Sequence, residues 1–234
     1  DEGLQTRLQL YEYSVDGVTF RYRAASHQKK LIKRLNERAK QDFTEINRAL
    51  PTTWKAPIDI WVVPRASDYF TKIEDREQSP VPDWAVGVAV DSDLIVLASQ
   101  ARPSVDEIER TFIHELVHSA VEASVDKGGI PRWFHEGIAI YFADDWSSEQ
   151  SERLAQAAAS NTLLDFRQLH SGFPEHHNRA SVAYAQSFHL VRHFVDRFGL
   201  KTLRELFVDI AGGASFYSAF KSVTGTEFVQ FERE

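Results

Sequence analysis

Cysteine is missing from this sequence of 234 residues. Disulfide bonds, cysteine nucleophiles and thiolate metal sites are therefore all excluded. Any metal ion must be bound by His, Asp or Glu, and nine histidines supply candidate ligands. Methionine is also missing and the first residue is Asp1, which indicates a trimmed or processed start. Such a start favours an exported protein over a cytoplasmic one.

Long hydrophobic runs are absent too, because no stretch approaches the ~18 consecutive apolar residues of a membrane span. We therefore expect no transmembrane segment. The net charge is −7, and this acidic balance argues against a nucleic-acid partner. The basic segment 27–40 also carries apolar residues at helical spacing, so we interpret its charges as the solvated face of a helix. Neither a glycine-rich phosphate loop nor a G-x-S-x-G motif is present, which leaves nucleotide hydrolysis and serine esterase chemistry without support.

The first hundred residues alternate between strand and helix patterns. A helix is expected over residues 26–49, ended by Pro51. Residues 74–83 are charged and proline-rich and should form a loop. Strands are expected at residues 15–22, entered by an Asp-Gly turn, and at residues 58–63. Two further strands, at residues 85–90 and 94–98, are expected to form a hairpin.

The remainder of the chain is mainly helical. Ser104 and Glu107 fit a capping box, which predicts a helix that runs to about residue 125 and stops at Gly128 and Gly129. Pro131 suits the first turn of a second helix that ends near Asp144. Later helices are expected near residues 148–160, 180–198, 200–211, 214–221 and 225–233. We therefore expect one α+β domain over residues 1–234, with a sheet subdomain in residues 1–103 and a helical subdomain in residues 104–234.

The capped helix contains the motif His114-Glu115-Leu116-Val117-His118. Four residues along a helix turn by roughly 400°, so both imidazoles lie on one face, one turn apart. This spacing lets two ring nitrogens bind one Zn²⁺ at about 2.0–2.1 Å. Glu115 is offset around the helix and can face a water at the metal without being a ligand. The alternative is a helix with two core-facing histidines and a surface glutamate.

A catalytic zinc site needs a third protein ligand and an open position. A third His six residues after His118 is excluded, because that position is Ser124. Glu136 follows on the next helix, among apolar residues where a lone carboxylate would be costly to bury. A metal would remove that cost, whereas the alternative is an ordinary charge on a helix face. His135 competes as a ligand, but it points about 100° away from Glu136.

The motif at residues 114–118, followed by Glu136 on the next helix, resembles the gluzincin metallopeptidases. The resemblance is in particular to the peptidase MA-like group related to aminopeptidase N. The resemblance covers roughly residues 85–200. It implies a zincin-like fold, a Zn²⁺ cofactor, and an antiparallel edge strand beside the metal helix that binds extended substrate. We expect that strand to be residues 94–97.

The resemblance also implies an oxyanion-stabilising tyrosine at the start of a later helix, and Tyr184 has that placement. A packing role for Tyr184 is an equal alternative. In thermolysin-type enzymes an Asp orients a zinc-bound His, but Ile140 occupies that position here. The residue that would orient the histidine is therefore not identified, and the candidates are Asp144, Glu122 and Asp165. The Gly-x-Met-Glu-Asn motif of aminopeptidases is missing, which leaves endopeptidase and exopeptidase action both open.

Other histidines compete with these ligands. His189 and His193 share the same four-residue spacing, but no Glu follows the first of them and their neighbours favour a packing role. His170, His176 and His177 fall in a stretch with Gly and Pro, which predicts a loop that either rims the cleft or is solvated.

The sequence therefore predicts a zinc-dependent metallopeptidase that acts on a peptide or protein substrate. Zn²⁺ is expected on His114, His118 and Glu136, with Glu115 as general base and Tyr184 as oxyanion donor. One alternative is a catalytically degenerate zincin fold used for binding, with or without zinc. Another is a structural zinc ion that links two helices. Substrate, specificity and oligomeric state do not follow from the sequence.

Overall fold

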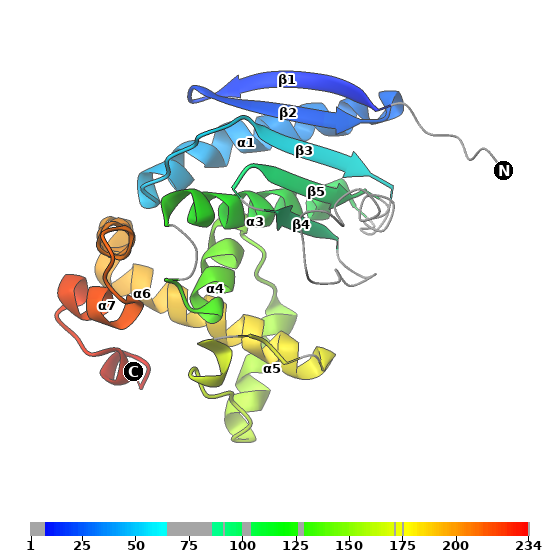
Figure 1. Ribbon diagram of the computed structural model, residues 1–234. Coiled ribbons are helices and arrows are strands. Elements are labelled where there is room, and N and C mark those ends of the chain that lie inside the picture. Colours follow the sequence, from blue (N-terminus) through cyan, green and yellow to red (C-terminus); the bar gives the residue numbers. More distant parts are fainter. Residues whose placement is uncertain are drawn as a thin grey trace. The chain divides into compact units, whose positions relative to one another are not determined.

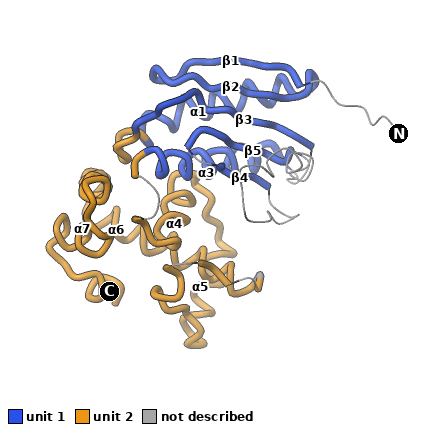
Figure 2. The backbone as a smooth tube through the Cα atoms, in the orientation of Figure 1, with its two compact units in different colours: residues 1–46, 53–123 blue, residues 47–52, 124–234 orange. Residues whose placement is uncertain are grey.

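The computed structural model describes residues 8–64, 86–90, 92–99, 104–125, 129–170, 172–174 and 176–233. The chain divides into two compact units (Figure 2). The first contains residues 1–46 and 53–123, and the second contains residues 47–52 and 124–234. The loop expected at residues 74–83 and the helix stop at Gly128 lie outside the described residues.

The described strands of the first unit form one five-stranded mixed sheet (Figure 1). Its order is β1-β2-β3-β5-β4, with antiparallel pairs at both ends and parallel pairs between β2, β3 and β5. The strands are β1 (Gln9–Val15), β2 (Val18–Ala24), β3 (Ile58–Val63), β4 (Gly87–Val90) and β5 (Leu94–Ala98). A mixed sheet followed by a mainly helical region is the α+β fold that the sequence predicts.

Most of the expected strands are confirmed, and one strand was missed. The strand expected at residues 15–22 is β2, and it is entered by the predicted turn at Asp16 and Gly17, with positive φ angles of 49° and 80°. The missed strand is β1, which precedes this turn. An Asp-Gly pair tolerates this left-handed backbone, which suits a two-residue hairpin turn. The hairpin of β4 and β5 forms as expected.

Two helices pack on one face of the sheet, α1 (Lys29–Ala49) and α3 (Val105–Ser124) (Figure 1). A short 3₁₀ turn, η1 (Ser26–Gln28), precedes α1. The ring of Phe20 on β2 lies 5.1 Å from that of Phe43 on α1, and Tyr22 lies 6.1 Å from Phe112 on α3. Alternate residues of β2 therefore face these helices, as the period of a strand requires.

The start of α3 confirms the predicted capping box. The Glu107 backbone N–H donates to Ser104 Oγ at 3.3 Å, and the Ser104 N–H donates to the Glu107 carboxylate at 3.1 Å. These two bonds satisfy helix N-terminal donors reciprocally. The cap therefore fixes the residue at which α3 begins.

The expectation that residues 94–97 form the edge strand is wrong. They belong to β5, which pairs with β3 on one side and β4 on the other. Every residue of β5 is buried, as is typical of an interior strand. Among the described strands, the antiparallel edge next to β5 is β4.

The second unit consists of helices connected by short loops. The helix expected at residue 131 is α4 (Arg132–Ala143), capped by Asp144 in the left-handed conformation. The two helices expected before and after residue 199 are α6 (His177–Ala211), interrupted at Gly199 by a φ of 80°. The remaining elements are α5 (Ser148–Ala159), η2 (Gln168–His170), α7 (Phe216–Thr224) and α8 (Phe228–Phe231). Of the last helix expected at residues 225–233, only this four-residue turn forms.

The close contact between α4 and α6 depends on a glycine, which has no side chain. A Cβ added to Gly137 would lie 2.4 Å from the Ser187 carbonyl oxygen and 2.7 Å from Val191 Cγ2. The two backbones therefore approach more closely than any larger residue at position 137 would permit. Trp133 and Phe134 of α4 also enter an aromatic core that includes Phe216 and Phe228.

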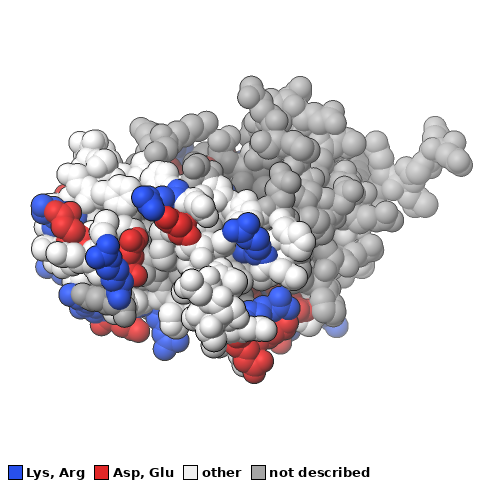
Figure 3. All heavy atoms as spheres, turned by 90° about the horizontal axis from the view of Figure 1, so that it is seen from below, with Lys and Arg blue, Asp and Glu red and all other residues white. Residues whose placement is uncertain are grey.

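The helix surfaces of this unit carry charges of both signs. Several ion pairs join residues one helical turn apart, including Glu149 with Arg153 and Lys201 with Glu205. On the face in Figure 3, basic and acidic side chains lie interspersed among uncharged ones. Within the described parts of the chain, no helix combines the length and the apolar character of a membrane-spanning helix.

We predict that Gly137→Ala destabilises the protein although alanine is the better helix former. The new methyl group would overlap a backbone carbonyl that cannot rotate away, at a cost of about 1–3 kcal/mol. Urea unfolding measures the change. The control is Gly172→Ala, where nothing lies within 4 Å of the added Cβ and the free energy of unfolding should stay within about 0.5 kcal/mol. Equal stability of the two variants would contradict the packing argument.

Candidate metal centre

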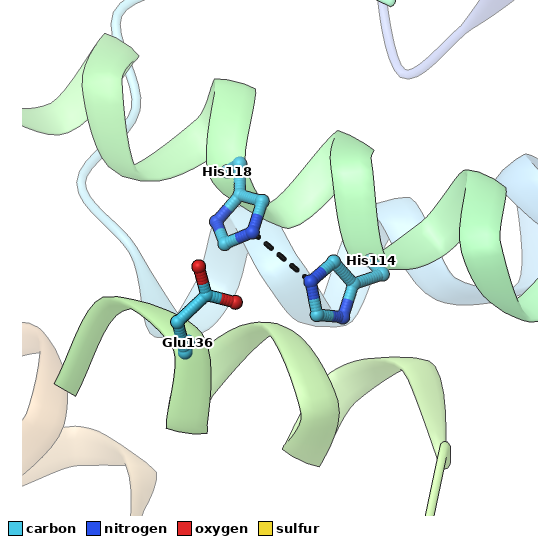
Figure 4. A group of neighbouring side chains, drawn as sticks. All are labelled: His114, His118 and Glu136. Carbon is cyan, nitrogen blue, oxygen red and sulfur yellow. Dashed lines mark hydrogen bonds between the residues drawn. The ribbon is translucent and has the colours of Figure 1, made fainter. Parts of the chain in front are cut away.

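The two imidazoles of α3 face each other on one side of the helix. His114 Nε2 and His118 Nε2 lie 3.0 Å apart, and the ring planes are nearly perpendicular (Figure 4). Two ligands at about 2.0–2.1 Å on a tetrahedral ion are about 3.3 Å apart. The observed separation is therefore close to what one shared zinc ion requires.

The polar residues on this side of α3 are largely withdrawn from water. His118 is 9% exposed and Glu115 is 8% exposed, whereas His114 is half-buried. Their apolar neighbours Ile113 and Val117 are fully buried. Burying polar groups is costly unless they are hydrogen-bonded or bind a metal. A binding function explains why α3 keeps these side chains in its buried part.

Glu136 is the buried carboxylate of α4. The residue is 2% exposed, and Phe134, Gly137 and Ile138 near it on α4 are buried as well. Its Oε1 forms an ion pair with Arg132, one turn earlier, at 2.5 Å. The surface-charge alternative for Glu136 is therefore wrong, because the side chain is not on the surface.

Three side chains together form a group with the composition of a metal site. The candidate ligand atoms of His114, His118 and Glu136 all lie within 4.8 Å of one another (Figure 4). His135, the competing ligand, is not in this group. Two imidazoles and one carboxylate are a donor set that catalytic zinc sites use, with a fourth position left for water or substrate. The residues present therefore fit a zinc ion.

The side chain of Glu115 lies against the edge strand. A Cβ added to Gly87, the first residue of β4, would be 3.0 Å from Glu115 Oε1 and 2.7 Å from Thr111 Cγ2. The β4 backbone therefore passes directly over the carboxylate, and only glycine leaves the space. This contact could not be predicted from the sequence, because it depends on strand pairing.

Tyr184 lies on α6 and is half-buried. Its ring packs edge-on against Phe173 with a centroid distance of 4.8 Å. Its role at an oxyanion stays a prediction, and the packing alternative has this contact in its favour.

None of the three acids considered as partners of the histidines belongs to the ligand group. Asp165 binds Arg167 through both carboxylate oxygens, and these hydrogen bonds hold its pKa below the ordinary value. Asp144 is exposed and ends α4. Glu122 is exposed on α3. The ion pair of Arg132 with Glu136 was not expected from the sequence.

The second histidine pair is not part of the ligand group. His189 is exposed, and the ring of His193 stacks on Phe231 at 4.9 Å. Both line a cavity of about 770 Å³ between α5, α6 and α8. The stacking contact supports the packing interpretation for His193.

A family model and one curated relative match the chain. The model, described as the peptidase MA superfamily, matches residues 38–234. The uncharacterized protein YhcO of Bacillus subtilis (strain 168) is 27% identical over 134 residues, which cover 54% of this chain and 39% of YhcO.

Solved structures of zinc metallopeptidases share the fold. An M1 zinc metallopeptidase mutant from Deinococcus radiodurans matches with a TM-score of 0.56 at 14% identity, over 97% of this chain and 51% of the other. An aminopeptidase N family protein from Idiomarina loihiensis matches with a TM-score of 0.52 at 11% identity, over 97% and 46%. The chain thus spans about half the length of the structures it matches. At these identities the likeness establishes a zincin-like fold.

We predict that Gly87→Ala lowers the free energy of unfolding by about 1–3 kcal/mol, because the new methyl group overpacks the space beside Thr111 and Glu115. Urea unfolding in the presence of a chelator measures the loss without a contribution from bound metal. Thr111→Ser removes the methyl group that the new Cβ would meet at 2.7 Å, so the double variant should recover part of the loss. Strict additivity of the two changes would contradict the contact.

Proposed function

The chain belongs to the peptidase MA superfamily, and on this premise we propose that it hydrolyses peptide bonds with a zinc ion held by His114, His118 and Glu136. The observation that carries the proposal is the group of three ligand atoms within 4.8 Å, with two imidazole nitrogens 3.0 Å apart. When bound, zinc polarises the scissile carbonyl and lowers the pKa of a water to about 7.

Glu115 is the general base of the proposal. Its carboxylate takes a proton from the attacking water and passes it to the leaving amine. Its burial, 8% exposed, supports this role, because a carboxylate shielded from bulk water keeps the transferred proton close to the reacting groups. Tyr184 is proposed as the oxyanion donor, a role in which its hydroxyl would stabilise the developing charge.

The substrate is proposed to be an extended peptide that pairs with β4 rather than with β5. The support is the sheet order, in which β4 is the antiparallel edge next to β5 among the described strands, and the approach of Gly87 to Glu115. Strand addition supplies backbone hydrogen bonds that do not depend on side-chain identity. A peptide bound in this way would run past the general base.

The metal proposal predicts one zinc ion per chain and a higher melting temperature with zinc than with a chelator. His118→Ala should abolish both effects, because an imidazole and a carboxylate alone are too few ligands. Metal analysis and thermal unfolding measure them. If chelation unfolds the chain completely, the ion has a structural role instead.

The catalytic proposal predicts that Glu115→Gln retains zinc and loses hydrolysis of an unstructured protein such as labelled casein by roughly 10²–10⁴-fold. The control is Glu109→Gln on the same helix, where the carboxylate pairs with Arg34 and activity should be unchanged. Substantial activity in Glu115→Gln would refute the mechanism. One zinc ion per chain without turnover in the wild type would favour the degenerate, binding form of the fold.

A further inference from the structure

Arg132 and Glu136 form a pair with very unequal surroundings. The Arg132 side chain is 50% exposed, whereas the Glu136 side chain is 3% exposed, and Arg132 Nη2 lies 2.5 Å from Glu136 Oε1. A guanidinium and a carboxylate at this separation form a close ion pair. The exposed partner thus reaches inward to a carboxylate that water hardly contacts.

Helix stability does not explain the position of this arginine. Arg132 is the first residue of α4, where the helix dipole disfavours a positive charge, and the first turn contains no acidic residue to compensate. An Arg placed before its Glu partner is also the weaker order for a pair one turn apart. The benefit of Arg132 must therefore lie at the carboxylate it contacts.

We propose that Arg132 is a positioning residue that orients Glu136 as a metal ligand. The inference rests on the proposed zinc site. A carboxylate has two oxygens with about four lone-pair positions, so Glu136 can contact the guanidinium and still offer a lone pair to a metal. The ion pair with Arg132 restricts rotation of the carboxylate before the metal arrives.

The planar guanidinium suits this task better than an ammonium group. Its donors form a rigid fork that matches a carboxylate and fixes the plane of the group, whereas lysine offers a rotating point charge. Arg132→Lys should therefore retain part of the function, and Arg132→Gln should lose nearly all of it.

The test is the zinc affinity of the full chain, measured by competition with a chelating dye. Loss of an outer partner of a metal ligand typically weakens binding by 10–100-fold, so we expect Arg132→Gln to bind zinc about 10–100-fold more weakly than the wild type, with Arg132→Lys between them. The matched control is Arg192→Gln. Arg192 also precedes its acidic partner, Asp196, by one turn, but both side chains are exposed and 3.6 Å apart, so its loss should leave zinc affinity unchanged.

Two further readouts separate positioning from general stability. The visible spectrum of the Co²⁺-substituted protein should change in Arg132→Gln, because the ligand carboxylate is free to rotate, and should not change in Arg192→Gln. Thermal unfolding with a chelator identifies any loss of fold. If Arg132→Gln is unfolded, the comparison rests on Arg132→Lys, which keeps the charge and should still bind zinc several-fold more weakly.

The outcomes distinguish this inference from the proposed function. Zinc affinity of a folded Arg132→Gln within twofold of the wild type, or tighter than it, overturns the positioning role while the zinc site stands. A wild-type chain that binds no zinc overturns both. Zinc binding that depends on Arg132 without peptide hydrolysis supports the positioning role and overturns only the catalytic proposal.

Discussion

Burial of polar side chains on α3 is the constraint on which the rest of the structure depends. The helix must cover a sheet face with Phe112 and Leu116 and at the same time keep His118 and Glu115 nearly out of water. The cost of desolvating these groups falls only when a ligand or a partner satisfies them. The capped start of α3 and the glycine of β4 both serve this arrangement. The cap fixes the helix register, and the glycine leaves room for the carboxylate.

Local chemistry in the sequence was sufficient to predict the helices near the site. Ser104 and Glu107 marked the start of α3, and Pro131 marked the start of α4, because capping and proline preferences act within one turn. The order of strands was not predictable in this way. Which neighbour a strand pairs with depends on the whole sheet, so β5 was taken for the edge. The burial of β5 on both faces was nevertheless visible in its unbroken apolar run.

The same distinction holds for the site. Spacing alone indicated His114 and His118, since a helix converts a fixed interval into a shared face. Glu136 was indicated by its apolar neighbours and by the need of a catalytic zinc site for a third ligand. Gly87 had no such pattern, because its contact with Glu115 exists only once the strand lies over the helix. Arg132 was visible as the residue one turn before Glu136, and a charge that opposes the helix dipole was the available indication.

Two neighbouring positions of α4 require their residues for different reasons. Glu136 is a buried charge whose proposed use is chemical, whereas Gly137 is required by the nearness of the Ser187 backbone. Glu136 can therefore be replaced during evolution while Gly137 is retained. A relative that lacks the proposed zinc site would be free to exchange the glutamate, but it would still need the glycine for the close contact of α4 with α6. The residues at these two adjacent positions thus distinguish relatives that keep the candidate metal centre from relatives that keep only the fold.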